Sequence, residues 1–382
     1  MVALDLDEMQ QMLQELAHQF ALDEIRPNAE HWDNESEYPL QAIKAADELG
    51  LLNLHIPEAY GGAGLGSMEE VVVTEELAWG DPGFATAAYA TSLAIAPIIT
   101  GGTEEQKQKW LRKVAEEGAL ASYCVTEPEA GSDVASIATT AIKDGDDYII
   151  NGEKMFITGA GYADFFFVLT KTDPTAGYKG MSGFVVESNA EGVSLGKKES
   201  NMGQRCSDTR SVIFNNVRVP ASQLIGGSES GGWMNAMNAF DMSRPNIAAQ
   251  ATGLARAAFE HALQYSDERE TFGQKLHQHQ AIQFMLADMK TKVEASRLLT
   301  WKSAALADAG QKNTEAAAHA KRFAADAAME VSTDAVQVFG GYGYSEEYPV
   351  ARLMRGAKVL QIYEGSSQVQ RMIIGREMLR GL

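Results

Sequence analysis

Cysteine is scarce in this chain of 382 residues, which contains only Cys124 and Cys206. Two cysteines are too few for a disulfide framework or a cysteine metal site, so we expect a reducing compartment and a cytoplasmic protein. Basic residues are also scarce, because 32 Lys and Arg stand against 52 Asp and Glu, which gives a net charge of −20. We therefore expect no nucleic-acid partner, since this charge repels a phosphate backbone.

Signals for export, membrane insertion and metal binding are missing too. The start, MVALDLDEMQQ, is acidic where a signal peptide would be basic. We find no apolar stretch of the roughly 18 residues that a membrane helix needs, so we expect no membrane insertion. The seven histidines form no cluster with metal-ligand spacing, so we expect no metal site.

Hydrophobic residues make up 45% of the chain, enough to fill the cores of the two or three domains that this length predicts. Residues 1–118 predict an N-terminal α-helical domain, because their apolar residues recur at helical spacing between GG and DPG turns. Helices are predicted over residues 5–28, 40–49, 67–78, 85–99 and 103–117. Pro97 predicts a kink in the fourth of these helices, or the start of a new one.

Residues 119–231 have a different texture, with short β-branched and aromatic runs that predict a middle antiparallel β-domain. Within one of these runs, YIINGEKMFIT, the pair Asn151 and Gly152 predicts a two-residue hairpin. The strands are confined to the middle of the chain, and no GxGxxG motif opens a helix. A doubly wound nucleotide-binding fold is therefore disfavoured.

Residues 232–382 return to helical spacing and predict a C-terminal bundle of about four antiparallel helices. The long helices are predicted over residues 237–268, 280–309 and 313–339. In the second of them, apolar residues form a stripe that predicts core packing rather than a cofactor site: Ile282, Met285, Met289 and Val293. The predicted fold class is α+β multidomain, with a helical domain on each side of the β-domain.

Glu364, in the stretch LQIYEGSSQVQR, is the first candidate for chemistry. The apolar residues before it predict a hydrophobic wall, and Ser366 and Ser367 after it can cap a helix from Gln368 onward. A carboxylate buried against such a wall has a raised pKa and can take a weakly acidic proton from carbon near neutral pH. The alternative is a solvated loop glutamate that precedes a helix.

Four further motifs each allow a ligand role beside an ordinary structural one. TEPEAGSD, residues 126–133, can present backbone N–H groups to a phosphate, or be a β-turn. MFIT, residues 155–158, puts Phe156 and Thr158 on the same strand face, where a flat ring could bind, or is a half-buried strand. RETFG, residues 269–273, offers an arginine to a pyrophosphate or to solvent. DMSRP, residues 241–245, is a ligand site or a surface ion pair.

The order of these motifs and the helix–strand–helix layout resemble the acyl-CoA dehydrogenase family, and medium-chain members most closely. The resemblance covers nearly the whole chain and rests on YCVTEPEAGSD, KMFIT, NMGQRCSDTR, RPNIAAQATGLA, RETFG, HQAIQFMLADM, QVFGGYG and QIYEGSSQVQR. It implies a homotetramer that binds FAD between its domains, an acyl-CoA substrate and an electron-transferring flavoprotein as electron acceptor. It also implies that Glu364 takes the α-proton while the β-hydride passes to the flavin, which gives a trans-2-enoyl-CoA.

The resemblance also implies the roles of individual residues, with Glu364 as the catalytic base. The implied FAD contacts, some of them to the cofactor of a neighbouring subunit, are Tyr123, Val125, Thr126, Gly131, Ser132, Phe156, Ile157, Thr158, Arg269, Thr271, Phe272, His279, Gln280, Gln337, Gly340, Gly341, Ser366 and Gln368. The implied substrate contacts are Ser132, Asp241, Ser243, Arg244, Tyr89, Tyr363 and Gly365.

Some positions depart from the family pattern. Phe156 stands where many members have Trp, and Glu129 and Gly356 replace a usual Gly and Asp. Isovaleryl-specific members carry the base on the helix that here holds Ser243, and Glu364 argues against that arrangement. Glutaryl-specific members use an arginine in the segment that here spans residues 84–93, which contains none. The resemblance places Tyr89 of that segment near the floor of the acyl pocket, and its ring there implies a short or medium straight-chain substrate.

Three alternatives stay open from the sequence. Two are enzymes: a flavin acyl-CoA oxidase, and a dehydrogenase of a cyclic or aryl-propionyl thioester. The third belongs to another class, a catalytically silent helical scaffold that keeps the fold for assembly alone. A yellow flavin spectrum in the purified protein separates the scaffold from the enzymes.

Overall fold

The computed structural model describes residues 5–380, and its N-terminal part is helical as predicted. The helices are α1 (Glu8–Phe20), α2 (Ala29–Asn34), α3 (Leu40–Glu48), α4 (Ser67–Gly80), α5 (Pro82–Gly101) and α6 (Glu104–Glu117). The single helix predicted over residues 5–28 is wrong at its end, because α1 gives way to a π-helical turn at Ala21–Ile25. Asp7 caps α1 by accepting a hydrogen bond from the Gln10 N–H at 2.9 Å.

Helix α5 differs from its prediction in two respects. It continues through Pro97 as one helix, so a second helix does not begin there. Burial of most of its side chains outweighs the one hydrogen bond that a proline removes. The helix is also apolar enough to span a membrane by length and composition, with a mean hydropathy of 1.4, so the expectation that no apolar stretch reaches this length is wrong. In this fold 78% of that window is buried inside the protein, where α5 contacts α4, α7 and β1.

The middle part forms a seven-stranded sheet in the order β1-β4-β2-β3-β7-β6, with β5 paired to β4. The strands are β1 (Ala121–Cys124), β2 (Thr140–Asp144), β3 (Asp147–Ile157), β4 (Phe165–Lys171), β5 (Met181–Glu187), β6 (Val193–Lys198) and β7 (Arg210–Pro220). Most neighbouring strands are antiparallel, but β4 pairs in parallel with both β1 and β2. The sheet is therefore mixed, because the long connection from β1 to β4 lets the chain return in the same direction.

The hairpin predicted at Asn151 and Gly152 is wrong. Both residues lie inside β3, and the hairpin that joins β2 to β3 turns instead at Gly145 and Asp146. Gly152 marks a β-bulge, where the register between β3 and β7 shifts. A Cβ at this position would lie 2.3 Å from Thr139 Oγ1, so the glycine permits a close approach of two backbones rather than a turn.

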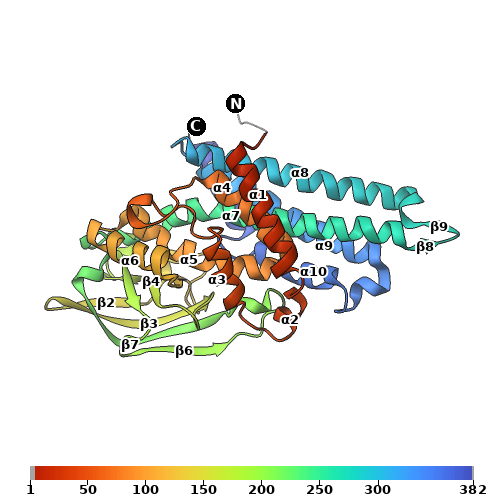
Figure 1. The fold of residues 1–382 in the computed structure, drawn as a ribbon. Coiled ribbons are helices and arrows are strands. Elements are labelled where there is room, and N and C mark those ends of the chain that lie inside the picture. The colour runs from red at the N-terminus through yellow and green to blue at the C-terminus, as the bar shows by residue number, and fades with distance from the viewer. Residues whose placement is uncertain (1–4, 381–382) are drawn as a thin grey trace.

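The C-terminal part contains three long helices, α7 (Gly232–Glu268), α8 (Gln280–Asp308) and α9 (Thr314–Phe339), and the shorter α10 (Pro349–Leu360) and α11 (Ser367–Leu379). The predicted core stripe of α8 is confirmed, since Met289 and Val293 are fully buried and Ile282 and Met285 pack against the same core. The sheet lies at one end of the molecule, and a small hairpin, β8 (Glu270–Thr271) and β9 (Gln274–Lys275), projects from the opposite end of the long helices (Figure 1).

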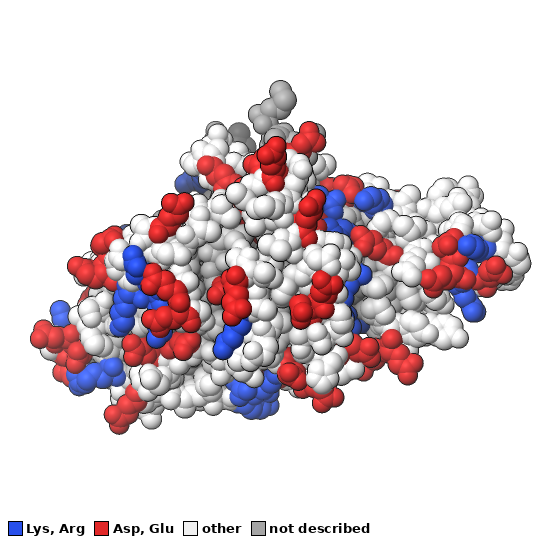
Figure 2. Space-filling view, in the orientation of Figure 1, with Lys and Arg blue, Asp and Glu red and all other residues white. Residues whose placement is uncertain are grey.

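The excess of acidic residues does not gather into one patch on the face shown in Figure 2. Acidic side chains are spread over that face, and basic side chains lie among them. Acidic and basic groups mixed in this way give this face no large basic patch that would attract an anionic ligand from afar.

Candidate active site

Glu364 lies in the tight loop between α10 and α11. Its backbone has a left-handed conformation with φ of 54°, and Gly365 follows with φ of 85°. A left-handed glutamate is strained, and such strain persists only where the surroundings hold it. Ser366 Oγ accepts a hydrogen bond from the Val369 N–H at 3.3 Å, which confirms the predicted cap at the start of α11.

Two buried side chains hold this loop through its carbonyl groups. Gln370 Nε2, one turn into α11, donates to the Glu364 carbonyl at 3.1 Å and to the Gly365 carbonyl at 3.0 Å. Lys321 Nζ, on α9, donates to the Gly365 carbonyl at 2.7 Å. The loop that carries Glu364 is therefore fixed from two helices, and this accounts for its strained backbone.

The carboxylate of Glu364 is partly buried and accepts a hydrogen bond from Ser243 Oγ of α7 at 2.8 Å. Burial raises the pKa of Glu364, while the Ser243 hydrogen bond and the charges of Arg244 and Lys321 act in the opposite direction. A carboxylate with a raised pKa is a stronger base than a solvated one. The surroundings of Glu364 thus raise its pKa, as the sequence predicted.

Three tyrosines from different parts of the fold lie near enough to the carboxylate for its charge to act on them: Tyr89 of α5, Tyr123 of β1 and Tyr363 in the loop itself. Burial raises the pKa of all three phenols, that of Tyr363 to about 12, and the charge of Glu364 contributes in each case. They therefore stay neutral near pH 7 and form an uncharged wall beside the base.

Each of these phenols is held by a hydrogen bond. Tyr89 accepts from Asn246 Nδ2 at 2.9 Å, and Tyr123 donates to the Ala236 carbonyl at 3.4 Å. Tyr363 donates to Gln250 Oε1 at 3.2 Å. The rings around Glu364 are thus fixed in place rather than free to swing.

Arg244 brings a positive charge to the same region. It forms an ion pair with Asp241, as their spacing of three residues predicted, and Asp241 also accepts from Thr314 Oγ1 at 2.8 Å. The alternative of a surface pair is wrong, because only 7% of Arg244 is exposed. A guanidinium held close to a site by a partner is suited to an anionic or polar ligand group.

The candidate flavin residues of the middle domain come together where the chain leaves β1 and where β3 ends. The Met155 N–H donates to the Thr126 carbonyl at 2.8 Å, and the buried Lys154 pairs with Glu127 at 2.8 Å. These contacts join MFIT to TEPEAGSD, in which Gly131 and Ser132 are exposed.

Phe156 does not share a regular strand face with Thr158 as predicted. Its φ is 60°, and the pairing of β3 with β7 is irregular between Lys154 and Ile157, so the alternation of side chains stops there. The ring of Phe156 is nevertheless 58% exposed. The side chains of Val125 and Ile157 lie in the core, so any ligand contact of these two residues would come from their backbone.

These residues fit a flavin in their chemistry. An isoalloxazine ring has an apolar face and a polar edge, and Phe156 offers an exposed flat ring with the Thr158 hydroxyl two residues on. The open turn at Gly131 has space around it, since a Cβ there would meet nothing within 4 Å. Backbone N–H groups of such a turn can bind phosphate oxygens.

A third set of predicted cofactor residues lies elsewhere, at the far end of the long helices. It comprises Arg269, Thr271, Phe272, His279, Gln280, Gln337, Gly340 and Gly341, most of them exposed. On α9, Gln337 lies sixteen positions after Lys321, about 24 Å along the helix axis. One chain therefore does not bring this set to Glu364, whereas Ser366 and the exposed Gln368 lie in the Glu364 loop and the first turn of α11.

Several residues around Glu364 were not predicted as site residues. Lys321, Gln370, Asn246 and Gln250 are fully buried polar side chains on α7, α9 and α11. The one available signal was a polar residue at a core position of a helical pattern, as for Lys321 among the alanines of AAAHAKRFAADAA. That signal shows burial but not which loop the side chain reaches.

Comparisons with known proteins identify the family of this chain. Three family models match consecutive segments: acyl-CoA dehydrogenase, N-terminal domain, over residues 7–118; middle domain, over 122–217; and C-terminal domain, over 230–379. The chain is 43% identical over 381 residues to a probable medium-chain specific acyl-CoA dehydrogenase 2, mitochondrial, of Caenorhabditis briggsae, which covers 99% of this chain and 92% of that protein.

Two solved structures are similar over almost their full length. Butyryl-CoA dehydrogenase from Megasphaera elsdenii has a TM-score of 0.96 and 42% identity, covering 99% of this chain and 100% of that one. A chain from work on the electron transferring flavoprotein of Acidaminococcus fermentans has a TM-score of 0.97 and 43% identity, with the same coverage. The family models, the identity and the shared fold agree, and this chain belongs to the acyl-CoA dehydrogenase family of oxidoreductases.

Proposed function

We propose that the protein is an FAD-dependent acyl-CoA dehydrogenase that converts an acyl-CoA thioester to a trans-2-enoyl-CoA, with Glu364 as the base. The observation that carries this proposal is the Glu364 loop. A carboxylate with a raised pKa is held in a strained backbone by buried donors and is surrounded by neutral phenols. This is the arrangement that removal of a weakly acidic proton from carbon requires.

The chemistry divides between the chain and the cofactor. Glu364 takes the proton from Cα of the thioester, and the C–H electron pair left on Cα forms the new double bond to Cβ. When bound, FAD accepts the hydride that leaves Cβ. The Glu364 N–H can donate to the thioester carbonyl and stabilise the negative charge that develops there.

The predicted site residues fall into two groups, those that would contact the cofactor and those that would contact the substrate. Tyr123, Phe156, Thr158 and the turn with Gly131 would hold the flavin of the chain's own site, in keeping with a family of FAD flavoproteins. Ser132, Asp241, Arg244 and Gly365 would contact the thioester arm of CoA. In this proposal the site works in a cytoplasmic homotetramer that passes its electrons to an electron-transferring flavoprotein.

The direct experiment is to add butyryl-CoA to the purified yellow protein without oxygen and to follow the flavin absorbance. Loss of the oxidised flavin band, with formation of the enoyl-CoA, is expected. A protein that purifies without flavin would support a silent scaffold instead. Rapid reoxidation by oxygen, rather than by an electron-transferring flavoprotein, would support an acyl-CoA oxidase.

Substrate length gives a further prediction, which concerns Tyr89. We propose that its ring forms the floor of the acyl pocket and favours short to medium straight chains, because Asn246 holds the hydroxyl in place. Tyr89→Ala should move the optimum of kcat/KM to longer acyl-CoAs, since each methylene that gains a buried place is worth about 0.8 kcal/mol. Tyr89→Phe, which keeps the ring, is the matched control. An optimum that does not move in Tyr89→Ala would refute the floor assignment.

Arg269 gives a prediction about the oligomer. It lies at the far end of the long helices, with its guanidinium 6.0 Å from the ring centre of Tyr342, and we propose that it binds the FAD pyrophosphate of a neighbouring subunit. Arg269→Ala should then lower flavin content and tetramer mass together, measured by absorbance and light scattering on dilution in salt. Arg112→Ala, which removes an exposed arginine of α6, is the control. Unchanged flavin and mass in Arg269→Ala would contradict the shared site.

A further inference from the structure

Lys321 is unusual because its side chain is 0% exposed, which is rare for a lysine. The same face of α9 is lined by fully buried alanines, among them Ala317, Ala320 and Ala324. Burial of an ammonium group is costly unless it is paired, so core packing gives no reason for a lysine here. Its Nζ is directed to one acceptor, the carbonyl of Gly365, at 2.7 Å.

Three charged groups act on Lys321 from the elements around it. They are Glu364 of the loop, Arg244 of α7 and Asp326 of α9 itself. Burial lowers the pKa of Lys321 to about 7, although Glu364 and Asp326 act to raise it. The effect is mutual, because the positive charge of Lys321 also lowers the pKa of Glu364.

We propose that Lys321 is a positioning residue for Glu364, which holds the strained loop through the Gly365 carbonyl and favours the ionised carboxylate by its positive charge. This inference rests on the proposed function, in which Glu364 is the base. It assigns two separable effects to one side chain. The hydrogen bond sets the position of the base, and the charge sets the pH at which the base becomes ionised.

The direction of the pH effect follows from the charge. Flavin reduction needs ionised Glu364, so its rate falls as the pH drops through the pKa of that carboxyl group. Below its pKa of about 7 Lys321 carries a positive charge, and that charge lowers the pKa of Glu364. Loss of the charge should move the acid limb of the pH profile upward, by about one pH unit for one opposite charge near a carboxylate.

The experiment compares flavin reduction by butyryl-CoA in single turnovers between about pH 5 and about pH 9. Lys321→Met removes both the charge and the hydrogen bond, and should shift the acid limb upward and lower the plateau. At a pH well below the limb, the expected loss from the shift alone is about tenfold. Lys302→Met, which removes an exposed lysine of α8, should leave the profile unchanged.

An acid limb that stays in place in Lys321→Met, even with a lower plateau, would overturn the proposal, because a purely structural role moves only the plateau. If Lys321→Met does not fold, Lys321→Gln keeps a donor in the same place and should still shift the limb. Flavin reduction at the normal rate in Glu364→Gln would refute the base itself, and the inference with it. An unshifted pH profile in Lys321→Met, together with slow flavin reduction in Glu364→Gln, would instead refute only the role of Lys321.

Discussion

Glu364→Gln is expected to lower the rate of flavin reduction by acyl-CoA by at least about 10² to 10⁴, the usual contribution of a general base. The amide has the same shape as the carboxylate, and its oxygen can still accept the hydrogen bond that Ser243 donates at 2.8 Å. The loop contacts made by Gln370 and Lys321 go to backbone carbonyls and stay in place. The substitution therefore removes the proton acceptor and little else.

The measurement is anaerobic stopped-flow absorbance with saturating butyryl-CoA. Flavin content and thermal midpoint should match those of the unmodified protein, which separates loss of the base from loss of the fold. Glu294→Gln, at a half-exposed position of α8 far in sequence from the Glu364 loop, is the matched control. A rate near that of the unmodified protein in Glu364→Gln would show that another group takes the proton.

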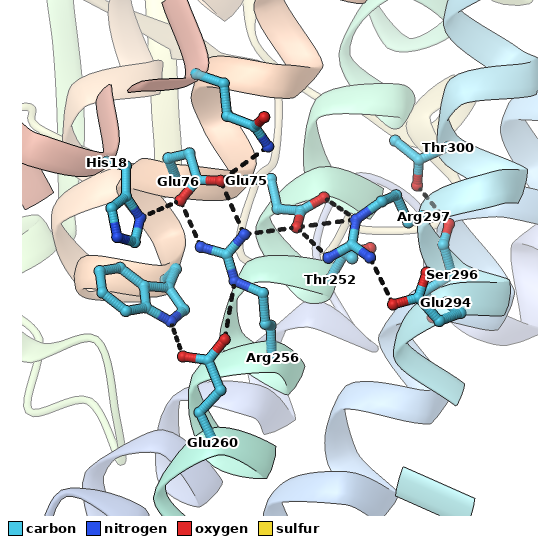
Figure 3. Close-up of polar contacts among 12 residues, drawn as sticks. His18, Glu75, Glu76, Thr252, Arg256, Glu260, Glu294, Ser296, Arg297 and Thr300 are labelled. Atoms are coloured by element: carbon cyan, nitrogen blue, oxygen red, sulfur yellow. Dashed lines mark hydrogen bonds and ion pairs between the residues drawn. The ribbon is translucent and has the colours of Figure 1, made fainter. Parts of the chain in front are cut away.

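The second large effect concerns stability and the contact between α4 and the long helices. Glu75 of α4 is 4% exposed and accepts from Arg297 of α8 at 2.7 Å and from Arg256 of α7 at 3.1 Å. Arg256 also pairs with Glu76, as Figure 3 shows. This network joins the N-terminal helices to the C-terminal ones through buried charges.

Glu75→Ala should destabilise the protein by about 3 kcal/mol, because it leaves the largely buried guanidinium of Arg297 without its main partner and removes one of the two glutamates that contact Arg256. The effect should lie at the low end of the range for a broken buried pair, since Glu76 and Glu294 still contact the two arginines. Thermal or urea unfolding of the flavin-loaded protein measures it. Glu294→Ala removes a half-exposed partner of Arg297 and should cost less than about 1 kcal/mol. Equal losses in the two variants would contradict this view of the network.

The sequence predicted the long, periodic elements well, because tertiary packing and local pattern agree there. It failed where one local signal had two structural uses. Asn151 and Gly152 are a hairpin signal, but in β3 the glycine serves a bulge. The run from Asp5 to Asn28 has helical spacing throughout, yet the helix changes to a π-turn at Ala21.

In the candidate site, features set by neighbouring residues were predicted, and contacts from distant parts of the chain were not. The cap at Ser366 and the buried setting of Glu364 follow from neighbours in sequence, and both were predicted. The partners that hold Glu364, Ser243 and Lys321, come from other helices, at separations that no local pattern contains. The roles of the distant cofactor residues came from the family resemblance alone.

The most direct test of the central claim isolates the proton step from hydride transfer. An acyl-CoA analogue with sulfur in place of the β-carbon has no β-hydride to lose, but its α-protons can still be taken by a base. In D2O, the flavin-loaded protein should exchange these α-protons for deuterium, and Glu364→Gln should not, as measured by mass spectrometry of the recovered thioester. Equal exchange by both proteins would contradict the assignment of Glu364 as the base.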